Sequence, residues 1–145
     1  MRTFVRLLFL LGSLATVADL LLLGHFEDKR QLIPFLLLGM GLVALGWLRF
    51  SPGPRSLRVF QGTMGLFAIA GCLGLYFHYQ GNMEFELEMY PSMKGLQLFW
   101  ESIRGATPAL APAAMIQLGL LGLASTCRHP AADANDPLQG VSQKV

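Results

Sequence analysis

Residues 7–24 read LLFLLGSLATVADLLLLG and contain a single ionisable side chain, Asp19. Three further apolar stretches follow, at residues 32–48, 59–77 and 106–127. The hydrocarbon core of a bilayer is about 30 Å thick, and a helix needs about 20 apolar residues to cross it. Each stretch is close to that length. The sequence therefore predicts four transmembrane helices, at about residues 4–25, 32–49, 57–79 and 108–127.

The composition favours the same fold class, an all-α membrane protein built on a four-helix bundle. Of the 145 residues, 53% are hydrophobic and 14% are charged, whereas soluble domains carry about 25% charged residues. Nearly all the charges lie at the chain ends and in the three connections, because an ionised group at the bilayer centre costs several kcal/mol. We expect a transmembrane domain over residues 1–128 and a polar, disordered cytoplasmic tail over residues 129–145.

The basic residues are shared unevenly between the two sides of such a bundle. The N-terminus, the second connection and the tail carry seven Lys and Arg side chains, whereas the first and third connections carry four. The positive-inside rule then places both termini in the cytoplasm. The apolar run continues beyond the weak cleavage pattern at residues 16–18, which favours an uncleaved signal anchor. These features are typical of a multi-pass protein of the bacterial inner membrane.

Small residues recur at helical spacing within the apolar stretches and predict close contacts between helices. They are Gly12, Ala15 and Thr16 in the first stretch, Gly39, Gly41, Ala44 and Gly46 in the second, Gly71 and Gly74 in the third, and Gly119 and Gly122 in the fourth. Asp19 shares the small-residue face of its helix. We therefore expect its carboxylate to point into the bundle, away from lipid.

The longest connection, residues 81–105, has a pattern of its own. Acidic and apolar residues alternate over residues 84–89, which in an extended chain places three carboxylates on one face. Residues 92–104 repeat apolar side chains at helical spacing. This predicts a short amphipathic helix that begins at Ser92, ends at Gly105, and lies at the membrane interface or caps the bundle as an outer lid. Its apolar face consists of Leu96, Phe99, Trp100 and Ile103.

The candidate functional residues are the polar side chains expected near the outer ends of the spans. Asp19 has the strongest single claim, because intramembrane carboxylates often mark ion or substrate paths. Imidazoles and carboxylates also bind divalent cations, although no metal-binding motif is present. The competing interpretation is that these groups are solvated interface residues. The set comprises Asp19, His25, His78, Glu84, Glu86 and Glu88.

Three functions remain open. The absence of a catalytic or phosphate-binding motif favours a non-enzymatic interaction or accessory subunit whose outer segment contacts another membrane protein or a second copy. One alternative is a small-solute or proton-coupled transporter that uses Asp19. Another is a metal-binding protein that uses His25, His78 and Glu84. No cofactor is predicted, and a net charge of +2 without a basic patch argues against nucleic acid as a partner. The lipid bilayer is the expected environment.

Overall fold

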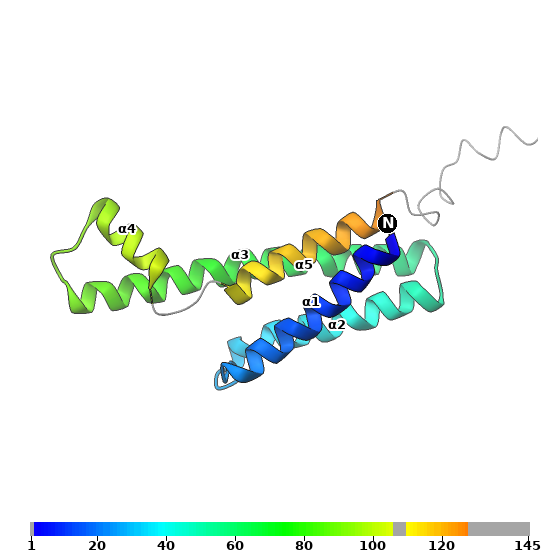
Figure 1. Ribbon diagram of the computed structural model, residues 1–145, viewed down its shortest axis with the longest axis horizontal. Coiled ribbons are helices and arrows are strands. Elements are labelled where there is room, and N and C mark those ends of the chain that lie inside the picture. The colour runs from blue at the N-terminus through cyan, green and yellow to red at the C-terminus, as the bar shows by residue number, and fades with distance from the viewer. Residues whose placement is uncertain (1, 106–109, 128–145) are drawn as a thin grey trace, which may run out of the picture.

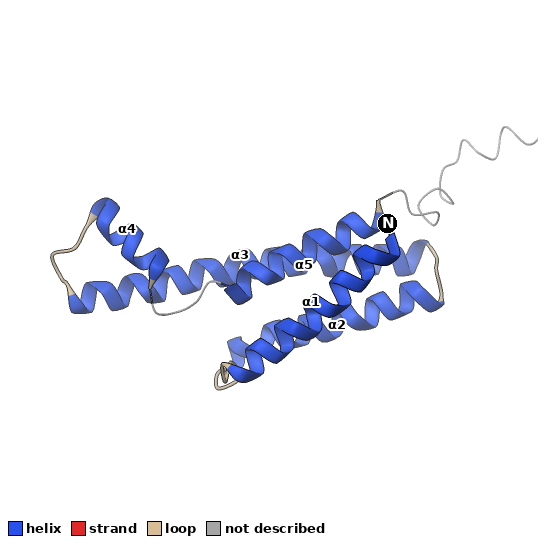
Figure 2. Cartoon of the chain, viewed as in Figure 1, coloured by secondary structure: helices blue, strands red, loops and turns tan. Residues whose placement is uncertain are grey.

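The computed structural model describes residues 2–105 and 110–127. Over these residues the chain is helical and has no strand (Figures 1 and 2), which confirms the predicted all-α class. The first residues of the fourth expected span and the expected tail fall outside the described residues. The helices in chain order are α1 (Arg2–Leu22), the short 3₁₀ helix η1 (Lys29–Gln31), α2 (Leu32–Phe50), α3 (Pro54–Met89), α4 (Gly95–Arg104) and α5 (Leu110–Thr126).

Within the described residues, three helical segments are long and apolar enough to cross a membrane: Thr3–Leu22, Lys29–Phe50 and Pro54–Met89. The fifth helix, α5, is also apolar, over Pro112–Thr126, but it is shorter. At 1.5 Å per residue, its 17 residues extend about 26 Å, against a hydrocarbon core about 30 Å thick. The structure thus has several helices of spanning length, while the fourth span stays a prediction.

The largest departure from the sequence analysis is α3, which continues for 36 residues. Residues 84–89, expected to be extended, form its last turns, so the period-two interpretation is wrong. Glu, Leu and Met are good helix formers, and adding a residue to an existing helix is easier than starting new structure. The helix ends at Met89, and Tyr90 leaves the helical conformation because it precedes Pro91.

An amphipathic helix, α4, is present, but it begins later than expected. It begins at Gly95, whose φ of 65° favours glycine, so Ser92 is not its cap. α4 folds back beside α3, and Asn82 Nδ2 donates a hydrogen bond to the Ser102 carbonyl oxygen at 3.0 Å. Both of these residues are buried. Because α4 packs through Ser102, its apolar face is covered only in part, and Leu96 is 80% exposed.

Aromatic side chains join α1, α2 and α3 within the bundle. The ring of Phe9 in α1 lies 5.9 Å from those of Phe60 and Phe67 in α3, measured between centroids. All three rings are at most 1% exposed. A Cβ added to Gly41 of α2 would lie 2.8 Å from Phe67, so only glycine allows α2 to approach this cluster. The first three helices therefore meet at this level.

Glycines also bring α3 and α5 into close contact. A Cβ on Gly71 would lie 2.6 Å from the Pro112 carbonyl oxygen, and one on Gly119 would lie 2.7 Å from the Met64 carbonyl oxygen. These contacts confirm the small-residue packing predicted for the third and fourth stretches. In the second stretch Gly41 is tightly packed, whereas Gly39 and Gly46 have nothing within 4 Å.

Candidate functional site

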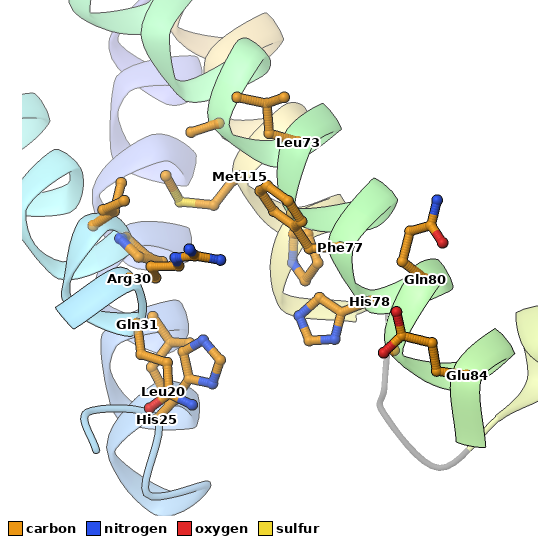
Figure 3. A pocket seen from close by; sticks show the side chains of 16 residues that line it. Leu20, His25, Arg30, Gln31, Leu73, Phe77, His78, Gln80, Glu84 and Met115 are labelled. Carbon is orange, nitrogen blue, oxygen red and sulfur yellow. The ribbon is translucent and has the colours of Figure 1, made fainter. Parts of the chain in front are cut away.

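A cleft of about 530 Å³ separates the α1–α2 hairpin from the α3–α5 pair (Figure 3). The hairpin contacts α3 at the aromatic cluster and diverges from it toward the loop that joins α1 to α2 (Figure 1). The cleft occupies the space between these diverging pairs. It is therefore a consequence of the divergence of the two helix pairs.

The walls of the cleft are mostly apolar. Leu20 of α1 and Met115 of α5 are 1% and 3% exposed and lie deepest in it. Ile33, Leu73 and Phe77 retain 50%, 52% and 56% of their surface, although they line a concavity. The remaining apolar lining comes from Pro34, Ala70, Gly74 and Pro112. Much of this apolar surface has no protein packed against it.

Polar side chains gather at the mouth of the cleft, from both of its walls. The imidazoles of His25 and His78 stack with centroids 6.3 Å apart and planes 17° apart. The first wall also supplies Arg30 and Gln31, and α3 supplies Gln80 and Glu84. Figure 3 shows Arg30 extending from η1 toward α3, and His78 pointing back from α3 toward the α1–α2 hairpin. The mouth thus combines a guanidinium, two imidazoles and a carboxylate.

The end of α1 determines where His25 lies. Gly24 adopts a φ of 64°, which favours glycine. The His25 N–H donates to the Leu20 carbonyl oxygen at 2.9 Å, and the Gly24 N–H donates to the Leu21 carbonyl oxygen at 3.1 Å. These are the two hydrogen bonds of a Schellman C-cap. The Gly24-His25 pair therefore turns the chain so that the imidazole faces the cleft.

A second local motif positions Arg30. The Gln31 side-chain oxygen accepts hydrogen bonds from the N–H groups of Glu27 at 2.8 Å and Asp28 at 3.1 Å. These bonds organise the turn before η1 and satisfy two backbone donors. Because η1 leads directly into α2, Arg30 is held at the cleft rather than on a long loop.

The structure separates the residues that sequence analysis grouped as one site. His25, His78 and Glu84 all line the cleft. Glu86 lies instead with Glu101 in a groove between α3 and α4. Glu88 is exposed and is not part of the cleft lining.

Asp19 is exposed and does not line the cleft, so the expectation that it points into the bundle is wrong. The buried face of α1 is Phe9, Ser13, Thr16 and Leu20, at the spacing of one helical stripe. Asp19 precedes Leu20 by one position, about 100° around the helix. The Thr16 hydroxyl donates to the Gly12 carbonyl oxygen at 2.8 Å. It is therefore engaged with the backbone of its own helix.

Two of the three residues in the metal-binding interpretation, His25 and His78, lie next to each other. Stacking brings the imidazoles of His25 and His78 together. Within residues 2–105 and 110–127, however, no three His, Cys, Asp or Glu side chains are grouped closely enough to hold a metal ion. Glu84 shares the cleft without completing such a group.

Sequence reasoning missed Arg30, Gln31 and Gln80 as cleft residues. Arg30 was considered only for its charge and its effect on membrane orientation. The sequence signal for an ordered position of Arg30 was the glutamine three residues after Asp28. This is the spacing of a capping box, which predicts an ordered turn at the outer end of the first connection. Nothing in the sequence indicated that α3 would carry Gln80 to the opposite wall.

No family model matches this chain, and searches of curated proteins and of solved structures found no significant match.

Proposed function

We propose that this chain is a non-enzymatic, multi-pass membrane protein that serves as an interaction or accessory subunit. Its binding element is the projecting hairpin, defined as residues 79–105, which comprises the end of α3 and all of α4. The partner is an extramembrane surface of another membrane protein. The observation that carries the proposal is the apolar face of α4, which α3 holds in place and leaves about half exposed or more.

Helix lengths support the placement of the projecting hairpin outside the bilayer. The helices α1, α2 and α5 contain 21, 19 and 17 residues, which corresponds to about 26–32 Å. The 36 residues of α3 correspond to about 54 Å. Because only residues 51–53 separate α2 from α3, the excess length lies at the far end of α3. Tyr76 and Tyr79, before that excess, suit the aromatic belt of a membrane boundary.

The exposed face of α4 has the composition of a binding surface. Phe99, Trp100 and Ile103 are 47%, 53% and 49% exposed, next to Leu96. Contiguous exposed apolar patches mark interaction sites, and aromatic residues frequently dominate the energy of protein interfaces. The Arg104 guanidinium lies 5.5 Å from the Trp100 ring centroid, an arrangement that favours one orientation of the indole.

The direction of α4 favours a protein partner over the bilayer. A helix that lies in the membrane interface runs parallel to the membrane plane, across the spanning helices. α4 instead runs obliquely back toward α3, with its start away from α3 and its end beside it (Figure 1). The hydrogen bond from Asn82 and the contact of Phe99 with Tyr79, at 5.9 Å between ring centroids, maintain that direction. The apolar face of α4 therefore points outward from one side of the projecting hairpin.

Site-specific photocrosslinking in native membranes tests this proposal. A photoreactive amino acid replaces Leu96 or Trp100 in one set of variants and Gln97, an exposed polar residue of the same helix, in the matched control. We expect a discrete protein adduct from positions 96 and 100 and none from position 97. Adducts with lipid alone, or no adduct, would contradict the proposal. An adduct of twice the chain's mass would show that the partner is a second copy of this chain.

The structure gives less support to the two alternative functions. A transporter that uses Asp19 requires this carboxylate on a path through the bundle, whereas Asp19 is exposed outside the cleft. A metal centre at His25 and His78 requires a third ligand, and the described residues gather none. A binding role therefore fits the described side chains best.

A further inference from the structure

We infer that the cleft between the α1–α2 hairpin and the α3–α5 pair binds a zwitterionic membrane phospholipid with a primary ammonium group. Its acyl chain lies against the apolar walls, its phosphate contacts Arg30, and its ammonium group faces Glu84. The inference goes beyond the proposed function. It concerns a different face of α3 and a small amphiphile instead of a protein partner.

The apolar walls of the cleft form the surface against which the acyl chain would pack. A volume of about 530 Å³ falls within the range of about 300–1,000 Å³ that is usual for small-molecule sites. Ile33, Leu73 and Phe77 line the cleft with about half of their surface uncovered by protein. Covering such surface with hydrocarbon is favourable, whereas filling it with water is not. The cleft lies between helices of spanning length, so an acyl chain reaches it directly from the bilayer.

The positively charged side of the mouth accounts for the phosphate. Arg30 extends into the gap from η1, just before α2 (Figure 3). A guanidinium presents paired donors that match phosphate oxygens. His25 and His78 place ring N–H donors at the same level, where they face the phosphate from both walls. A phosphate at this position is close to three nitrogen-bearing side chains while its acyl chain remains in the apolar part of the cleft.

The Glu84 carboxylate is the group that the lipid ammonium would face, and it disfavours a headgroup that carries only negative charge. It belongs to α3 and lines the cleft opposite Arg30, and Figure 3 shows the two side chains on different walls. Within the part of the chain that is described, no ion pair joins Arg30 to Glu84. A headgroup with a phosphate and an ammonium group complements both walls. An anionic headgroup without the ammonium group would place like charges together, which is unfavourable.

Lipid binding to the purified protein tests this inference. The full chain is exchanged into detergent and titrated with phosphatidylethanolamine or phosphatidylglycerol, and bound lipid is counted by native mass spectrometry. We expect wild type to prefer phosphatidylethanolamine. Because a hydrogen bond to a charged group is lost, Arg30→Gln should weaken binding by about tenfold or more. Glu84→Gln should remove the preference for phosphatidylethanolamine. The matched control is Arg55→Gln, an exposed arginine outside the cleft, which should change neither property.

Each other outcome overturns the inference. Equal binding by wild type and Arg30→Gln would show that the cleft does not hold the phosphate. A wild-type preference for phosphatidylglycerol would contradict the role of Glu84. Inorganic phosphate that displaces the lipid at comparable concentration would indicate a site for free phosphate. Arg30 and Glu84 are both exposed, so their replacement leaves the packed core intact, and circular dichroism of each variant verifies the fold.

Discussion

Replacing Gly71 by alanine should destabilise the bundle, although alanine is the better helix former. A Cβ at this position would lie 2.6 Å from the Pro112 carbonyl oxygen and 2.8 Å from the Ile116 backbone nitrogen. Both atoms belong to the backbone of α5, so the whole helix must move away by most of an ångström. Overpacking of this kind costs about 1–3 kcal/mol, whereas the gain in helix propensity is about 1 kcal/mol. The net expectation is a loss of up to about 2 kcal/mol.

Gly65 provides a matched control in the same helix. An added Cβ there has nothing within 4 Å, so Gly65→Ala meets no steric cost. It should stabilise the protein by about 0.5–1 kcal/mol through the unfolded state and helix propensity. The two substitutions are chemically identical, lie six positions apart, and should have effects of opposite sign.

The measurement is unfolding of both variants in one detergent, followed by far-UV circular dichroism. The midpoint should fall for Gly71→Ala and rise for Gly65→Ala. Equal shifts in the same direction would refute the reasoning, because they would show that the contact between α3 and α5 is not set by the absence of a side chain at Gly71.

Three further predictions concern the contact between α3 and α4, the membrane orientation, and Asp19. Asn82→Ala removes the hydrogen bond to the Ser102 carbonyl oxygen, so local opening of α4 should become easier by about 1 kcal/mol, measured as faster amide exchange confined to α4. A membrane-impermeant maleimide should label Cys127, which is exposed, only from the cytoplasmic side, and should label Ser92→Cys only from the opposite side. Asp19→Asn should change the free energy of unfolding by less than about 0.5 kcal/mol, because the exposed carboxylate lies outside the packed face of α1.

The parts of the fold that depend on local pattern could be predicted from the sequence. Long apolar stretches predict long helices, and the repeat of Leu96, Phe99, Trp100 and Ile103 predicts α4. Which face of α1 is buried could not be predicted, because a small-residue face with Gly12, Thr16 and Asp19 is as plausible from the sequence as the face observed. Contacts of Phe9 and Leu20 with other helices decide it. That choice depends on tertiary packing, which no local spacing encodes.

The candidate site was predictable in its composition but not in its arrangement. His25 and His78 were both expected at the outer helix ends, and the structure stacks them. The cleft beside them lies where the α1–α2 hairpin diverges from α3, beyond the contacts of the aromatic cluster and Gly41. The role assigned to Arg30 depends on that divergence. A list of polar residues carries no information about where two helix pairs separate.

α3 is the element that the cleft and the projecting hairpin share, and it presents a different face to each. One face carries cleft residues such as Ala70, Phe77 and Gly81. Another face carries the residues that contact α4, Tyr79 and Asn82. Since each residue turns an α-helix by about 100°, the two faces lie roughly 150° apart. The two proposed activities should therefore be separable. Arg30→Gln should weaken lipid binding and leave crosslinking from position 96 unchanged, whereas Asn82→Ala should reduce that crosslinking and leave lipid binding unchanged. Coupled losses in both variants would show that the cleft and the projecting hairpin form one functional surface.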